Sequence, residues 1–135
     1  MAEKLTDFME LLEKNEPRPF TSPQVYYGSK EDSLTLYFRP DASYAHRLNG
    51  LVTLFLTYEG DELVGCQIKG LCRKLKTDGN FSVAITRNKE LELGLFFYVL
   101  AYEAPDRGPK NRLLELGDLA KGVKLDTKKM ALASC

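Results

Sequence analysis

The sequence predicts an α+β fold, in which an antiparallel sheet of four to six strands carries helices on one of its faces. Two observations lead to this fold class. Several segments, of which Ser33–Arg39 and Leu51–Tyr58 are the clearest, alternate apolar and polar residues with the period of two that half-buried strands show. Other segments, such as Arg112–Lys121, space their apolar residues as an amphipathic helix does.

The chain of 135 residues has the usual length of one domain, and we expect it to fold as a single unit. Its first residues place Leu5, Phe8, Met9 and Leu12 on one helical stripe. The prolines that follow cannot continue a helix. We therefore divide the chain into an N-terminal helix over 1–14, a proline-rich linker over 15–23, a sheet-forming core over 24–93, helices over 94–122 and a tail over 123–135.

The first half of the core holds most of the predicted strands. A short strand at Gln24–Gly28 and a turn lead to the alternating strand Ser33–Arg39, which Pro40 closes. We expect Ala42–Gly50, which holds the only histidine, to be a polar connection. The strands Leu51–Tyr58 and Leu63–Lys69 are separated by a short polar segment with a glycine, which is the usual signal of a hairpin.

The second half is predicted to be mainly helical. One or two helical turns are expected over Gly70–Lys76, and Phe81–Thr86 alternates as a strand does. Glu90–Glu103 begins with strand-like alternation, but its later part has no polar face, so we expect a strand that gives way to a buried helix near Gly94.

The chain is expected to end with a loop, one more helix and a tail. Proline and glycine in Pro105–Lys110 predict a loop, after which Asn111 can cap the helix Arg112–Lys121. Gly122 stands at the expected helix end, and the tail Lys124–Cys135 is predicted to be partly disordered.

Two segments within about residues 32–75 share the pattern of a known family. They are the strand Asp32-Ser33-Leu34-Thr35-Leu36-Tyr37-Phe38 and the segment Asp61-Glu62-Leu63-Val64-Gly65-Cys66-Gln67-Ile68-Lys69, which contains the motif Leu-Val-Gly-x-x-Ile. On these residues the sequence resembles a family of small bacterial domains of unknown function. The resemblance implies a small antiparallel sheet and no catalytic activity.

Composition excludes several classes of function. The 19 basic and 19 acidic residues balance, which argues against a uniformly basic nucleic-acid packager, and no apolar run approaches the length of a membrane span. The first residues lack the pattern of a secretory signal, and three cysteines cannot all pair within one chain. We therefore expect a cytoplasmic protein with reduced, buried thiols at Cys66 and Cys72. Their spacing does not suit a structural zinc site, and no metal or cofactor is expected.

One segment could form a small-ligand pocket. Asp41–Arg47 is polar and contains Tyr44, His46 and Arg47, which we take as candidate ligand-binding residues. His46 could also act as a base toward Ser43 or a cysteine, but no motif that presents a nucleophile accompanies it. We name no catalytic residue and favour a protein that is not an enzyme.

Two further sets of residues are candidate contact sites. Lys69, Arg73, Lys74 and Lys76 lie within eight residues that contain no acid, and such a patch could contact nucleic acid or a protein partner. Tyr37 and Phe55 lie on the strand faces opposite the main apolar stripes. If no helix covers that face, their rings form an interface patch.

We arrive at three hypotheses. The first is a non-enzymatic interaction module that self-associates as a homodimer, or binds a protein partner, through its sheet. The second is a small-ligand-binding domain or minor enzyme with a pocket near Asp41–Arg47. The third is a nucleic-acid accessory protein that uses the basic patch Lys69–Lys76. The sequence offers no membrane partner.

Overall fold

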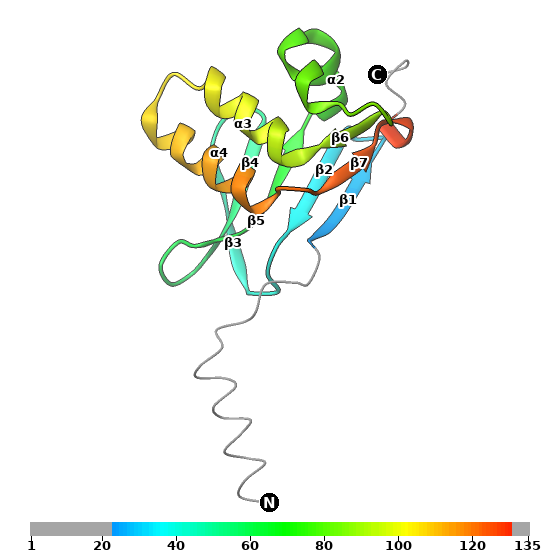
Figure 1. Cartoon of the computed structure of the whole chain (residues 1–135). Coiled ribbons are helices and arrows are strands. Elements are labelled where there is room, and N and C mark those ends of the chain that lie inside the picture. Colours follow the sequence, from blue (N-terminus) through cyan, green and yellow to red (C-terminus); the bar gives the residue numbers. More distant parts are fainter. Residues whose placement is uncertain (1–22, 131–135) are drawn as a thin grey trace, which may run out of the picture.

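The computed structural model describes residues 23–130. The predicted N-terminal helix over 1–14, nearly all of the linker and the last five residues of the tail therefore lie outside the described residues. Within the described part the fold is α+β, as predicted, with a five-stranded antiparallel sheet and a layer of helices (Figure 1). No helix in this part is both long and apolar enough to cross a membrane.

The main sheet is formed by the first five strands of the described chain. They are β1 (Gln24–Gly28), β2 (Ser33–Tyr37), β3 (Ser43–Arg47), β4 (Val52–Thr57) and β5 (Leu63–Lys69). Their order in the sheet is β1-β2-β5-β4-β3, and every neighbouring pair is antiparallel. The predicted hairpin is confirmed as β4 and β5, and β3 lies at one edge of the sheet.

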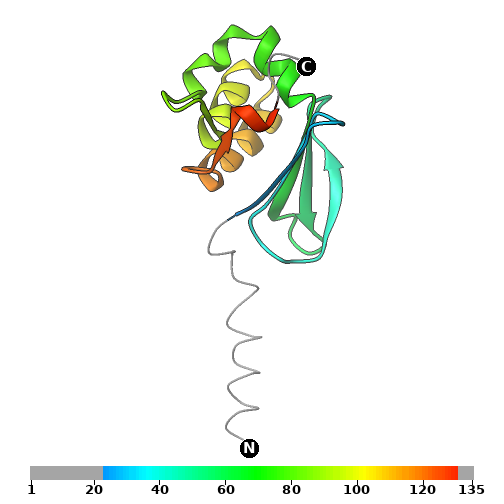
Figure 2. The same ribbon diagram turned by 90° about the vertical axis from the view of Figure 1, so that its right-hand side faces the viewer.

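The second half of the chain forms the helical layer, which lies on one side of the sheet (Figure 2). It contains α2 (Leu71–Thr77), the 3-10 helix η1 (Gly79–Ala84), α3 (Leu93–Glu103) and α4 (Arg107–Leu119). A small second sheet pairs β6 (Glu90–Glu92) with β7 (Lys124–Asp126), and the 3-10 helix η2 (Thr127–Met130) follows. The expected change from strand to helix near Gly94 is confirmed by β6 and α3.

The core lies between the sheet and the helices. Alternate strand residues point toward it, among them Leu36, Leu54 and Ile68, and the buried rings of Phe81 and Phe96 meet them from the helical layer. Helices α3 and α4 approach closely, since a Cβ at Gly94 would lie 3.0 Å from the carbonyl oxygen of Gly117. The opposite face of the sheet is not covered by any helix of the described residues (Figure 2).

Ala42–Gly50 was predicted to be a polar connection, and this prediction is wrong. Most of the segment is the strand β3. β3 pairs with β4 along its whole length, from Ser43 opposite Thr57 to Arg47 opposite Thr53. As an edge strand, β3 buries little of its surface. Its sequence therefore lacks the apolar alternation that would have revealed it.

The predicted strand Phe81–Thr86 is also wrong, because most of it belongs to η1. Phe81 and Ala84, three residues apart, are both buried, as the period of a 3-10 helix requires, whereas Val83 is 68% exposed. The side chain of Asp78 accepts a hydrogen bond from the Asn80 amide at 3.0 Å and caps the start of this helix. Only Ile85 forms a bridge, opposite Leu91.

The last helix starts earlier than predicted. Pro105–Lys110 is not only a loop, since α4 begins at Arg107, with Asp106 and not Asn111 at the N-cap position. Pro109 lies in the first turn, where the backbone amides have no acceptor within the helix, so proline is tolerated there. The tail is ordered as far as it is described, because Leu125 in β7 is buried and pairs with Leu91.

Candidate functional site

The edge strand β3 holds backbone groups that point away from the sheet. The amide of Leu48, just after β3, donates to the carbonyl oxygen of Val52 at 2.9 Å. In an antiparallel ladder only every second residue pair exchanges hydrogen bonds. Because Leu48 forms such a bond, His46 and Tyr44, two and four residues before it, are the residues of β3 that form backbone hydrogen bonds with β4. The backbone N–H and C=O groups of these two residues therefore point toward β4.

The alternate residues of β3 present the free edge. The N–H and C=O groups of Ser43, Ala45 and Arg47 point away from β4, and β3 has no second neighbour among the described strands. Such a row of groups is a template for pairing with another extended chain. Many edge strands are protected by a bulge or a proline, but the ladder of β3 has no register shift and its five residues include no proline.

A groove runs along β3 on the side of the helices. One cavity of about 390 Å³ lies between the β3–β4 hairpin and the first turns of α4. A second cavity of about 410 Å³ continues toward the end of α3. Leu48 and Pro109 line both cavities. We call the two together the β3 groove.

The floor of the β3 groove is apolar. Leu54 and Leu56 of β4 are buried beneath it, and Leu48 and Pro109 form its walls where the two cavities meet. His46 lies at the exposed rim. Cavities of this size with an apolar lining and a few polar groups are typical of binding sites.

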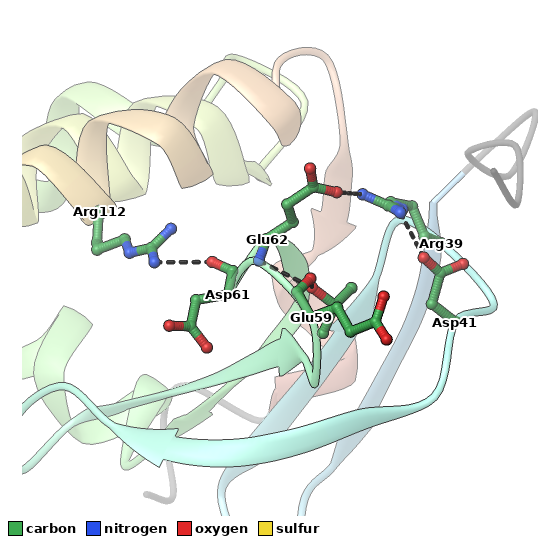
Figure 3. A network of polar contacts seen from close by, with 7 residues as sticks. Arg39, Asp41, Glu59, Asp61, Glu62 and Arg112 are labelled. Carbon is green, nitrogen blue, oxygen red and sulfur yellow. Dashed lines mark hydrogen bonds and ion pairs between the residues drawn. The ribbon is translucent and has the colours of Figure 1, made fainter.

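Three polar side chains form one end of the groove. The hydroxyl of Tyr44 donates a hydrogen bond to the carboxylate of Asp61. Arg112 of α4 donates through Nη2 to the backbone oxygen of Asp61 at 2.8 Å, which ties the helix to the turn between β4 and β5 (Figure 3). The hydrogen bond to Asp61 raises the pKa of Tyr44, and the nearby positive charge of Arg112 opposes this shift only in part.

The turn that carries Asp61 is held from its other side as well. Arg39 donates to the carboxylate of Glu62 at 2.8 Å and also pairs with Asp41 (Figure 3). The hydroxyl of Thr57 donates to the carbonyl oxygen of Glu59 at 2.7 Å and accepts from the Glu62 amide at 3.0 Å. These contacts fix the position of Asp61 and therefore of Tyr44 at the groove.

The hydrogen bond between Tyr44 and Asp61 makes a testable prediction. Asp61→Asn is expected to lower the pKa of Tyr44 toward the ordinary tyrosine value of about 10, because the negative charge that disfavours tyrosinate is removed. The measurement is an ultraviolet absorbance titration of tyrosinate, in which the difference from Tyr44→Phe isolates the signal of this residue. A Tyr44 titration curve that does not move in Asp61→Asn would show that the hydrogen bond is absent in solution.

The structure separates the three candidate ligand-binding residues of the sequence. Tyr44 and His46 both line the β3 groove. Arg47 is the next residue along the strand, so it lies on the opposite face of the sheet, where it is exposed. Sequence reasoning also missed Leu48 of the same segment, and it missed Asp61, Pro109 and Arg112, which come from segments far apart in the chain and carry no local signal.

Tyr37 and Phe55 lie together on the uncovered face of the sheet. Both face Gly65 of β5 in the register, and their rings stack over it with centroids 5.2 Å apart and planes 9° apart. A Cβ at Gly65 would lie only 3.0 Å from Cδ1 of Tyr37. Both residues are half-buried, and each ring covers the face of the other that points toward it.

The basic residues of the candidate nucleic-acid patch are spread over two elements. Lys69 ends β5, on the uncovered face, and Arg73 is an exposed residue of α2. The ammonium group of Lys74 lies 3.4 Å from Asp78 and 3.6 Å from Glu103, so two carboxylates offset its charge. Lys76 has an interaction partner as well.

The two described cysteines differ in state. Cys66 is free and buried in the core, where burial raises the pKa of its thiol. Cys72 is disulfide-bonded, so the prediction of a reduced thiol is wrong for this residue, and the argument for a cytoplasmic location from reduced thiols loses that support. Within residues 23–130 no group of three or more His, Cys, Asp or Glu side chains could hold a metal ion.

Comparison with known proteins gives no relative. The chain matches no protein-family model, no curated protein and no solved structure. The function must therefore be argued from the site itself.

Proposed function

We propose that this protein is an interaction module that binds an extended segment of a partner protein by adding it to the free edge of β3. The observation that carries the proposal is the position of the outward-pointing backbone groups of Ser43, Ala45 and Arg47 beside an apolar groove. Strand addition uses these two features together. The backbone groups supply hydrogen bonds to any sequence, and the groove selects among side chains.

The groove indicates the chemistry of the partner segment. In a strand added to β3, every second side chain would point toward the groove, and the others toward the uncovered face. The groove offers these side chains the apolar surfaces of Leu48, Leu54 and Pro109. Charges of both signs flank it, with Asp61 and Arg112 close together at one end. We therefore expect a partner with apolar residues at alternate positions and no strong net charge.

His46 and Arg47 of β3 offer a matched pair of substitutions that tests the proposal. His46 and Arg47 are neighbours in the same strand and both are exposed, but only His46 lines the groove. His46→Ala is expected to weaken binding of an added strand about three- to tenfold, because it removes a side chain from the rim of the groove, whereas Arg47→Ala leaves the affinity unchanged. Neither change is expected to alter stability by more than about 0.5 kcal/mol, because both side chains are exposed.

The probe for this experiment is a library of random decapeptides displayed on phage and selected on the wild-type protein. Selected peptides are synthesised with a fluorescent label, and their affinities are measured by fluorescence anisotropy. The proposal expects apolar residues at every second position of the selected peptides and weaker binding to His46→Ala than to Arg47→Ala. Peptides without alternation, or equal effects of the two substitutions, would count against binding at β3.

A small molecule in the same groove is the second candidate function. The cavity of about 390 Å³ has the volume of a small-ligand site, and the polar groups of Tyr44, His46 and Arg112 meet there. A small molecule within the cavity does not need the outward N–H of Ala45. A ligand whose affinity survives removal of that N–H would therefore identify this second function.

The observations favour a peptide over a nucleic acid. Lys74 is offset by two carboxylates, and the rings of Tyr37 and Phe55 stack on each other, so the inner face of each is not available to a base. The groove beside β3 has an apolar floor, which offers nothing to a phosphate backbone.

A further inference from the structure

The free edge of β3 is complementary to itself. Its five residues read Ser43-Tyr44-Ala45-His46-Arg47, and the residues whose backbone groups point outward are the first, third and fifth. When two such strands pair antiparallel with Ala45 opposite Ala45 of the second copy, outward residues meet only outward residues. This register uses all five residues of both strands, and each outward pair can exchange two hydrogen bonds.

The side chains also fit this register. On the uncovered face, the small side chain of Ala45 lies on the two-fold axis, where a larger one would meet its own copy. Arg47 lies opposite Ser43 of the second copy, so the two positive charges are kept at opposite ends of the pair. On the groove face, Tyr44 lies opposite His46 of the second copy, and their aromatic rings can pack across the strands. No two like charges stand opposite each other.

We infer that a second copy of this chain pairs with β3 through this register and forms a continuous ten-stranded sheet across two protomers. The inference rests on the proposed function, because the second copy uses the same backbone groups as a partner strand. The two occupants exclude each other. Self-pairing therefore regulates the site. At high protein concentration a second copy occupies the free edge of β3, and a partner must displace that copy to bind.

Exposure of Ala45 allows a substitution that separates the two occupants. Ala45 lies on the uncovered face, away from the groove, and is exposed. Ala45→Lys keeps the backbone N–H but places two ammonium groups opposite each other on the two-fold axis of the pair, which like-charge repulsion disfavours. Ala45→Ser keeps both the N–H and a small side chain, and is the matched control.

The test is sedimentation equilibrium of the full chain, with its disulfide intact, over a range of concentrations. The wild type and Ala45→Ser are expected to form dimers with the same dissociation constant, and Ala45→Lys to dimerise about tenfold more weakly or not at all. A wild type that stays monomeric at the highest concentration would overturn the inference. A dimer that Ala45→Lys leaves unchanged would do so too, since its interface would lie elsewhere.

A second measurement distinguishes failure of this inference from failure of the proposed function. The phage-selected decapeptide of highest affinity is titrated into wild type and Ala45→Lys, both at concentrations at which the wild type dimerises. Self-pairing predicts tighter apparent binding to Ala45→Lys, because its edge is not occupied by a second copy. Equal binding to the two proteins would refute competition while leaving peptide binding intact. If Ala45→Lys dissociates the wild-type dimer, and a selection on the monomeric Ala45→Lys protein, whose edge is free, still yields no peptide, the proposed function alone is refuted.

Discussion

Ala45→Pro is expected to weaken binding of an added strand roughly 5- to 150-fold while the domain stays folded. Proline removes the one outward N–H at the middle of β3, and the carbonyl of the bound strand that would accept from it is left without a donor. An unpaired buried acceptor costs about 1–3 kcal/mol, which gives this range of affinities. The measurement is anisotropy with a selected decapeptide.

The folded state should tolerate this proline for two reasons. The N–H of Ala45 takes no part in the β3–β4 ladder, and edge strands accept proline where the amide faces solvent. The side chain is exposed on the uncovered face, so the ring can extend toward solvent beside Phe55 of β4, which faces Ala45 in the register. Ala45→Ser, which keeps the N–H, is the control and should bind as the wild type does. Undiminished binding to a folded Ala45→Pro would point to a ligand within the groove instead.

Gly65→Ala is expected to cause the largest loss of stability of any single methyl addition to the sheet, about 2–4 kcal/mol. A Cβ at this position would lie 2.2 Å from the carbonyl oxygen of Leu36 and 3.1 Å from Cα of Tyr37. Both are backbone atoms of the neighbouring strand β2, so the strands would have to separate at the centre of the sheet. The added methyl group would also disturb the stack of Tyr37 on Phe55.

Equilibrium unfolding in urea, followed by circular dichroism, measures this effect. Gly79→Ala is the matched control, because a Cβ at Gly79 meets nothing within 4 Å, and its stability is expected to change by less than about 0.5 kcal/mol. A Gly65→Ala protein as stable as Gly79→Ala would contradict the close approach of β2 and β5.

The sequence predicted those parts of the fold that bury apolar surface. The alternation in β2 and β4 and the polar turn before β5 were sufficient to place the central strands, because each strand buries one face. β3 was missed because an edge strand with exposed residues needs no such alternation. The segment of η1 was predicted to be a strand because the apolar residues Phe81, Val83 and Ile85 stand at every second position. In the structure Val83 is exposed, and the residue buried together with Phe81 is Ala84, three positions later.

The candidate site was predictable only in part. Tyr44 and His46 were chosen because they lie in a polar segment with the only histidine, and the structure brings both to the β3 groove. Arg47 was chosen on the same ground, yet strand geometry turns it to the other face. The partners of Tyr44 across the groove come from a turn and from α4, and no pattern within one segment of a chain indicates which distant segment will face it.

Amide hydrogen exchange, measured residue by residue by NMR with and without a saturating selected decapeptide, tests strand addition at β3 most directly. The protein is kept dilute enough to be monomeric. Binding at the free edge predicts slower exchange of the outward amides of Ser43, Ala45 and Arg47, by at least about tenfold for Ala45, with little change for Tyr44 and His46, whose amides already bond to β4. Unchanged exchange at Ser43, Ala45 and Arg47, with slowing confined to α3 or to the uncovered face of the sheet, would contradict it.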